Sequence, residues 1–123
     1  KIKVYGFDIS KYAISRSKSE IKNDLFVHDA RKRFPFKNKK FDLVISLGCL
    51  HNFKIYDLEK SLKEISRVGK KQYIMVESFR NEKELFNLQC WALTAETFFH
   101  TVEWEWAFKK FNYRGEYEFI FFE

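Results

Sequence analysis

Asp8 and His51 are the residues whose positions in this sequence most directly suggest chemistry. Asp8 ends the apolar stretch Val4–Phe7, and ligands of parallel sheets bind at the carboxyl ends of strands. A carboxylate there can accept two hydrogen bonds from ribose hydroxyls, but an aspartate that leads a helix and is favoured by the helix dipole is an equal alternative. His51 follows another apolar run and has the ordinary pKa of a general base. A partly buried histidine bonded to the backbone is its alternative.

The two cysteines, Cys49 and Cys90, indicate neither a disulfide framework nor a metal site. They are far apart, and the sequence has no CxxC pair and no histidine pair at metal spacing. We therefore expect no metal and a reducing, cytoplasmic setting. No apolar run approaches membrane-spanning length, so we expect no membrane partner.

The composition favours one domain, residues 1–123, built around aromatic side chains. Hydrophobic residues make up 46% of the chain and aromatic residues 20%, including 15 Phe, which is ample for a core. The net charge is +6, with a basic cluster at Ala30–Phe41. We interpret this cluster as a solvated loop in preference to a nucleic-acid patch, since lysines are also scattered elsewhere.

Strand and helix patterns alternate along the chain. Short apolar runs predict strands, and apolar spacings of three and four predict helices. The expected strands are Ile2–Phe7, Leu25–His28, Asp42–Leu47, Gln72–Glu77 and Tyr117–Phe122. The expected helices run from Ser10 to about Glu20, over Ile55–Val68, from Asn81 and from Thr101, with Ser10, Asn81 and Thr101 as N-caps. This order predicts an α/β fold with a mostly parallel sheet and helices on both faces, in which Asp42–Leu47 is buried on both sides.

Several segments, taken in order, carry a family resemblance. VYGFDIS, LFVHDARKRFPF, KFDLVISLGCLHNF and LKEISRVGKKQYIMVES together resemble the class I S-adenosylmethionine-dependent methyltransferases, from their second strand onward. The segment from Glu77 looks like the substrate side of small bacterial methyltransferases of the UbiE-like type. The resemblance implies a Rossmann-like fold and the transfer of a methyl group from S-adenosylmethionine.

In that family an acidic residue at the end of the second strand binds the ribose, which corresponds to Asp8 here, and the next apolar residue, Ile9, would pack on the adenine. The motif of the family's third strand corresponds to Asp29 and Ala30. There the Asp29 side chain would accept from the adenine amino group, and the Ala30 N–H would meet a ring nitrogen. A turn-forming aspartate after a strand is the alternative for Asp29.

The motif of the family's fourth strand corresponds to Ser46–His51, where Leu47 and Gly48 would line the sulfonium end of the cofactor. His51 is the candidate base toward an acceptor hydroxyl or amine. Glu77, at the end of the next strand, either faces the substrate or caps the following loop. The late aromatics are expected in the core, with an acceptor pocket as the alternative: Trp91, Phe98, Phe99 and Trp104.

The family's first strand and its GxGxG loop have no counterpart in this sequence. We therefore interpret the chain as the larger, C-terminal portion of a methyltransferase, incomplete at the N-terminus and inactive alone. The missing strand leaves unpaired backbone groups, which a preceding segment, a different closure of the sheet, or strand exchange in a homo-oligomer could satisfy.

The leading hypothesis is an enzyme that methylates a small-molecule acceptor. Two alternatives come from other classes: a non-catalytic nucleotide- or protein-interaction module that has lost the cofactor site, and a basic RNA-binding α/β domain. The basic cluster at Ala30–Phe41 is the support for the last of these.

Overall fold

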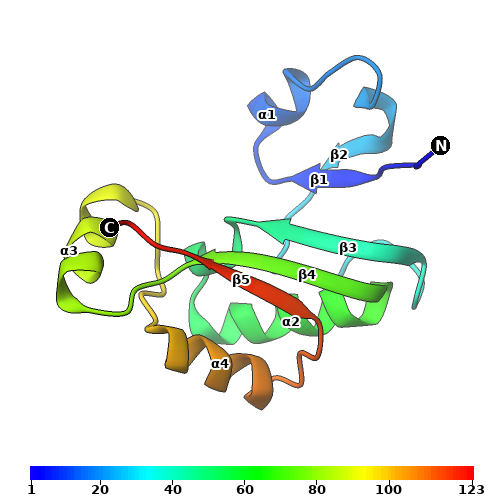
Figure 1. The fold of residues 1–123 in the computed structure, drawn as a ribbon. Helices are drawn as coiled ribbons and strands as arrows, with labels where there is room; N and C mark the ends of the chain where they lie inside the picture. Colours follow the sequence, from blue (N-terminus) through cyan, green and yellow to red (C-terminus); the bar gives the residue numbers. More distant parts are fainter. The chain divides into compact units, whose positions relative to one another are not determined.

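The computed structural model describes all residues, 1–123, and divides into two compact units, Lys1–Lys32 and Arg33–Glu123. Each unit is described by itself below (Figure 1). The single domain predicted over the whole chain stays a prediction. None of the helices combines the length and apolar character that crossing a membrane would require.

The smaller unit is built on a pair of short parallel strands. Its elements are β1 (Gly6–Asp8), α1 (Lys11–Ser15), the 3₁₀ turn η1 (Lys22–Asp24) and β2 (Leu25–Val27). Gly6 pairs with Leu25, and a Cβ at Gly6 would stand only 2.9 Å from Cδ2 of Leu25, so a larger residue at this position would need the Leu25 side chain to shift. The Phe7 and Phe26 rings pack with their centroids 5.5 Å apart.

Both early elements are shorter than predicted. The strand predicted at Ile2–Phe7 is wrong in its extent, because β1 has only the three residues of β2 as its partner. The helix predicted from Ser10 to Glu20 begins as expected, since Ser10 Oγ accepts from the N–H of Ala13 at 3.1 Å. It ends at Ser15, where serine hydroxyls bond to preceding carbonyls and compete with continuation of the helix.

The larger unit is a three-stranded parallel sheet in the order β3-β4-β5. Its elements are β3 (Phe41–Leu47), the 3₁₀ turn η2 (Leu50–Asn52), α2 (Ile55–Val68), β4 (Gly69–Glu77), α3 (Glu82–Trp91), α4 (Thr101–Lys110) and β5 (Glu116–Ile120). Parallel strands with connecting helices confirm the predicted α/β class and are consistent with a Rossmann-like methyltransferase fold.

The core of the larger unit lies between one face of its sheet and the helices α2 and α4 (Figure 1). The predicted helix Ile55–Val68 is confirmed, with its apolar residues spaced by three and four turned to the sheet. Ile74 and Val76 of β4 are fully buried on this face. The fully or almost fully buried apolar side chains from the two helices are Leu58, Leu62, Ile65, Val68, Trp104, Ala107 and Phe108.

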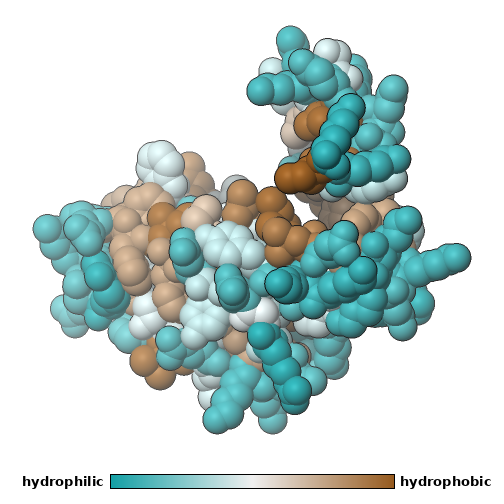
Figure 2. Space-filling model, turned by 45° about the vertical axis from the view of Figure 1, so that its right-hand side comes forward, coloured by the Kyte–Doolittle hydropathy of each residue, from teal (hydrophilic) through white to brown (hydrophobic).

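The prediction that β3 is buried on both sides is wrong. Leu43, Ile45 and Leu47 alternate along the strand and are 56%, 58% and 54% exposed. The reason is positional: β3 is an edge strand of its sheet, and α2 and α4 cover the opposite face. Figure 2 shows apolar side chains, drawn brown, at the molecular surface.

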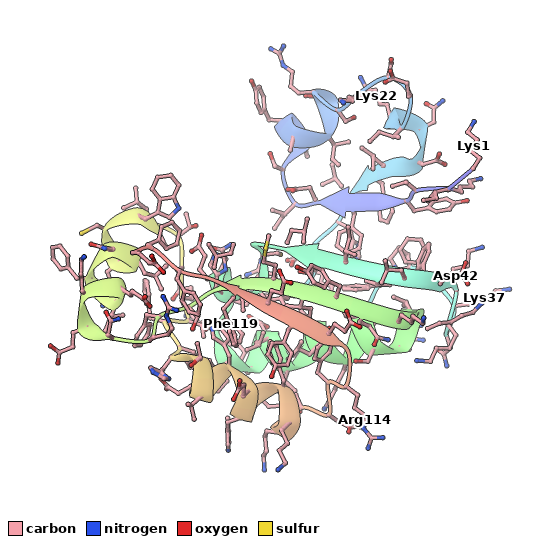
Figure 3. All side chains as sticks on the ribbon, viewed as in Figure 1. Lys1, Lys22, Lys37, Asp42, Arg114 and Phe119 are labelled. Atoms are coloured by element: carbon pink, nitrogen blue, oxygen red, sulfur yellow. The ribbon has the colours of Figure 1, made fainter.

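Polar side chains make contacts at the end of the larger sheet where β3 and β4 begin. At the end where β3 begins, Lys70 Nζ lies 2.8 Å from Asp42 Oδ1 (Figure 3 labels Asp42). The basic segment also contributes to the fold, because Lys39, with a φ of 54°, donates through Nζ to the carbonyls of Ser66, in the last turn of α2, and of Gly69, the residue that caps it. Cations in this cluster therefore stabilise a helix end.

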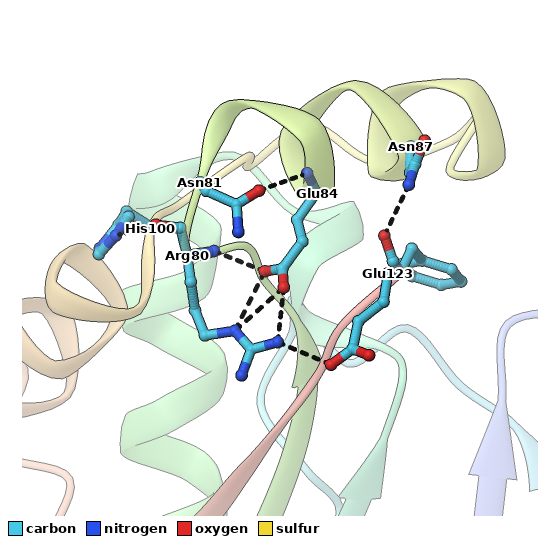
Figure 4. Close-up of polar contacts among 7 residues, drawn as sticks. Arg80, Asn81, Glu84, Asn87, His100 and Glu123 are labelled. Carbon is cyan, nitrogen blue, oxygen red and sulfur yellow. Dashed lines mark hydrogen bonds and ion pairs between the residues drawn. The ribbon is translucent and has the colours of Figure 1, made fainter.

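The cap predicted for α3 is confirmed, since Asn81 Oδ1 accepts from the N–H of Glu84 at 3.0 Å. The buried Glu84 carboxylate pairs with Arg80, whose guanidinium also reaches Glu123 (Figure 4). The cap predicted at Thr101 is wrong by one residue. His100 caps α4 instead, because its ring accepts from a backbone N–H of the first turn in a capping box.

Candidate active site

The predicted site residues fall in both units. In the smaller unit, β1 and β2 run parallel and end at the same edge of their sheet. Asp8 is the last residue of β1, and Asp29 follows β2 by two positions. The N–H of His28 donates to the carbonyl of Asp8 at 3.0 Å, which holds the two strand ends together. The structure therefore brings Asp8 and Asp29 to one edge.

The surroundings of Asp8 suit a nucleoside. Its carboxylate is exposed and accepts a hydrogen bond through Oδ1 from the N–H of Ser10 at 2.8 Å. Ile9, directly after it, is 61% exposed. An exposed carboxylate with an exposed apolar neighbour at a strand end is the arrangement that a ribose and an adenine ring need. These two residues fit the predicted cofactor.

Asp29 has a partner within its own unit. Both of its carboxylate oxygens accept from the Arg31 guanidinium, Oδ1 from Nε at 2.9 Å and Oδ2 from Nη2 at 2.8 Å. The hydrogen bonds from Arg31 lower the pKa of Asp29 to about 2. An oxygen of this carboxylate can accept a second bond, so the predicted contact to an adenine amino group would be shared with Arg31. Ala30 lies between Asp29 and Arg31 in the sequence.

In the larger unit, Leu47 ends β3 and Gly48 turns the chain away from it. Gly48 has a φ of 64°, a left-handed conformation that favours glycine, while its N–H still donates to the carbonyl of Met75 on β4 at 2.9 Å. The chain then enters η2, which carries His51. Leu47, Gly48 and His51 therefore gather at the carboxyl end of this sheet.

His51 meets a carboxylate that the sequence did not single out as catalytic. Its Nε2 lies 3.1 Å from Glu77 Oε2, and its Nδ1 lies 3.5 Å from the Glu77 N–H. The first contact has the distance of an ion pair but not the geometry of a hydrogen bond, because Glu77 Oε2 is buried without a hydrogen-bond partner. The contact is therefore weak, since direction decides the strength of a hydrogen bond.

Burial sets the protonation of this pair. It lowers the pKa of His51, whose side chain is 6% exposed, and raises the pKa of Glu77, whose side chain is 13% exposed. Each shift favours the neutral form of the residue. The Glu77 main chain is fixed by Trp104, whose Nε1 donates to its carbonyl at 3.3 Å. A buried acid and a buried base thus lie together on rigid elements.

A cavity of about 330 Å³ opens beside the pair. Its walls come from the turn after β3, the end of β4, the end of α3 and the loop that follows. The lining residues are Gly48, His51, Asn52, Glu77, Trp91, Ala92, Leu93 and Thr94. The volume is at the lower end of the range for small-ligand sites.

Sequence reasoning identified part of this cavity. Trp104 and Phe99 pack on each other at 5.3 Å and Trp104 is fully buried, so for Trp104 the core role is confirmed. Trp91 instead lines the cavity. The role of Glu77 could have been found from its register, because β3 and β4 are neighbours and their carboxyl ends coincide. Thr94 and Asn52 carried no local signal.

A comparison with protein families defines the class. Residues 2–76 match the model of the methyltransferase domain family, which is more than half of the chain. The chain therefore belongs to this family, whose members generally use S-adenosylmethionine. The more specific UbiE-like resemblance stays a prediction. Comparisons with curated proteins and with solved structures gave no match.

Proposed function

We propose that this chain takes part in the transfer of a methyl group from S-adenosylmethionine to a small-molecule acceptor. Membership of the methyltransferase domain family supports the reaction. The single observation that carries the acceptor side is the cavity with the buried His51–Glu77 pair at its wall. A sulfonium methyl donor supplies an activated methyl group, so the protein has to position the acceptor and take one proton from it.

The residues proposed to hold the cofactor are Asp8, Ile9, Asp29, Ala30, Leu47 and Gly48. The exposed Asp8 carboxylate would accept from the ribose hydroxyls, and Ile9 would cover the adenine. Asp29, sharing its oxygens with Arg31, would accept from the adenine amino group. These assignments are proposals that the family resemblance supports.

The proposed acid–base chemistry belongs to His51 and Glu77 as a pair. His51 is neutral at physiological pH because burial lowers its pKa, so it is able to take up a proton. The His51 Nε2 lies 3.1 Å from Glu77 Oε2, while its Nδ1 faces the Glu77 backbone N–H, and a proton leaving the acceptor is taken up within this pair. Trp91 and Leu93 line the same cavity.

Replacement of Asp8 tests the cofactor assignment. In the protein that carries this sequence, we expect Asp8→Ala to weaken binding of S-adenosylmethionine at least tenfold, because two ribose hydrogen bonds to a charged acceptor are lost. Isothermal titration calorimetry measures the affinity. Asp42→Ala is the matched control, since Asp42 is an exposed aspartate bonded to Lys70 near the start of β3. Equal affinities for wild type and Asp8→Ala would overturn the ribose assignment.

A further inference from the structure

The cavity beside His51 and Glu77 has an unbalanced charge. Of the eight residues that line it, Glu77 is the only acidic one, and none is a lysine or an arginine. Burial lowers the pKa of His51 and raises the pKa of Glu77, so a cation that pairs with the Glu77 carboxylate would offset its desolvation and stabilise its charged form. The remaining lining residues are uncharged. A ligand that brings a positive charge is therefore favoured over a neutral one, and an anionic ligand is disfavoured.

The Oε2 atom of Glu77 also has no hydrogen-bond donor within the protein. This oxygen is buried and accepts no hydrogen bond, although buried carboxylate oxygens are normally paired. Neither His51 nitrogen supplies the bond, since Nε2 approaches without hydrogen-bond geometry and Nδ1 faces the Glu77 backbone. An N–H group of a ligand in this cavity can satisfy Oε2, and a charged N–H does so most strongly.

An aromatic wall completes the arrangement. Trp91 lines the same cavity and is 67% exposed, so its ring is accessible to a ligand. Tryptophan is the aromatic side chain that attracts cations best. Its ring is held from behind by Phe122, at 5.6 Å between ring centroids. A carboxylate and an exposed indole in one cavity are the groups that recognise an organic ammonium.

We propose that the acceptor is a small primary or secondary amine, bound as its ammonium ion by Glu77 with Trp91 beside it. This inference rests on the proposed methyl transfer and names the class of its acceptor. One N–H bond of the ammonium breaks as the proton passes to the carboxylate of Glu77, which becomes a carboxylic acid. The nitrogen keeps the electron pair of that bond, and the free amine is the form that accepts a methyl group.

Three probes of similar size and different charge test the proposal by binding alone. Phenethylamine, 2-phenylethanol and phenylacetate share one ring and differ in a cationic, neutral or anionic head group. Titrated into the wild-type protein and followed by tryptophan fluorescence and calorimetry, phenethylamine should bind at least tenfold more tightly than the alcohol. Phenylacetate should bind more weakly than the alcohol.

Two pairs of variants assign the preference to residues. Glu77→Gln should reduce the affinity for phenethylamine to that for the alcohol, whereas Glu118→Gln, an equal charge change on a residue bonded to Tyr73, should not. Trp91→Ala should weaken the binding of phenethylamine. Trp106→Ala, which removes another exposed tryptophan outside the cavity, should leave this binding unchanged. If Glu77→Gln does not fold, the ranking of the probes on the wild type still decides.

The proposal is overturned if none of the probes binds, if all bind equally, if the anion binds best, or if Glu77→Gln keeps the preference. Its failure is distinct from failure of the methyl-transfer proposal. Calorimetry with S-adenosylmethionine reports on the latter, and the two titrations involve different ligands. If the protein prefers the amine but does not bind S-adenosylmethionine, the amine site is supported and the methyl-transfer proposal is contradicted.

Discussion

The contact between Arg31 and Asp29 shows how a single residue controls a predicted binding group. Arg31 donates to both Asp29 oxygens and keeps the pKa of that carboxyl near 2. Asp29 is thus ionised at any physiological pH, as a hydrogen-bond acceptor for an adenine amino group would need to be. The same contact limits the directions from which a ligand can approach.

Removal of that guanidinium should be visible in the titration of Asp29. We expect Arg31→Ala to raise the pKa of Asp29 from about 2 toward its ordinary value near 3.8, because the main hydrogen bonds to the charged form are lost. Carboxyl ¹³C chemical shifts followed against pH measure this change. Arg16→Ala, which removes an arginine lying over Tyr12 in the same unit, is the control. A titration of Asp29 unchanged by Arg31→Ala would contradict the assignment.

Burial of His51 links stability to pH. Because its folded pKa lies below the unfolded value of 6.5, the unfolded chain takes up the proton more readily as the pH falls through 6.5. Stability from His51 is therefore present above that pH and is lost below it. Glu77, with a raised pKa, acts in the opposite sense: its contribution falls as the pH rises above its ordinary value of 4.5.

Urea unfolding at pH 7.5 and pH 5.5 measures how much His51 contributes to the pH dependence of the free energy of unfolding. On going from pH 7.5 to 5.5, we expect wild type to change toward lower stability relative to His51→Gln, because the variant has no ring to protonate, whereas Glu77 is present in both proteins. The comparison uses the difference between the two pH values within each protein, so an overall destabilisation by the substitution does not enter. Parallel losses in both proteins would exclude His51 as the source.

At the scale of elements, α2 is the helix that stabilises the larger sheet. Its charged face and its buried leucines give it the most regular pattern in the chain, and the structure places it at the predicted residues. Leu62 is fully buried, so Leu62→Ala should lower the free energy of unfolding by about 2–5 kcal/mol through lost burial and a cavity. Tyr56→Ala, on the exposed side of the same helix, should change it by less than about 0.5 kcal/mol.

Denaturant unfolding followed by circular dichroism measures both variants. A loss at Leu62 no larger than that at Tyr56 would mean that α2 is not part of the cooperative core. The exposed side chain of Tyr56 makes it a suitable control, since it tests helix propensity without packing.

The helices and strands also show which sequence patterns depend on neighbouring residues alone and which depend on distant parts of the chain. Ser10 and Asn81 were predicted as caps correctly because a cap involves residues two or three positions apart. The predicted strand Ile2–Phe7 was too long because strand length depends on the partner strand. The predicted two-sided burial of β3 was wrong because the number of covered faces is decided by the whole sheet.

At the scale of the molecule, the family was recognisable from the order of several weak motifs, and the family match over residues 2–76 agrees with that interpretation. The candidate site was only partly predictable. Asp8 and His51 could be identified because each follows an apolar run. The contact between His51 and Glu77 spans 26 positions and depends on the register of two neighbouring strands, which no local pattern encodes.

The unpaired edge of β3 is a position at which another strand could join the sheet. Its sheet continues on one side through β4 and β5, while β3 has no further strand in that sheet. Added strands pair readily with such edges, so completion of the sheet by another segment or another copy stays a prediction.

The last two residues have an influence beyond their own position. Glu123 reaches Arg80, which anchors Glu84 at the start of α3, and the carbonyl of Phe122 accepts from Asn87 in the middle of that helix. The Phe122 ring supports Trp91 at the end of the helix. Loss of these two side chains would therefore weaken the support of α3 behind the cavity wall, without changing a residue that a ligand contacts.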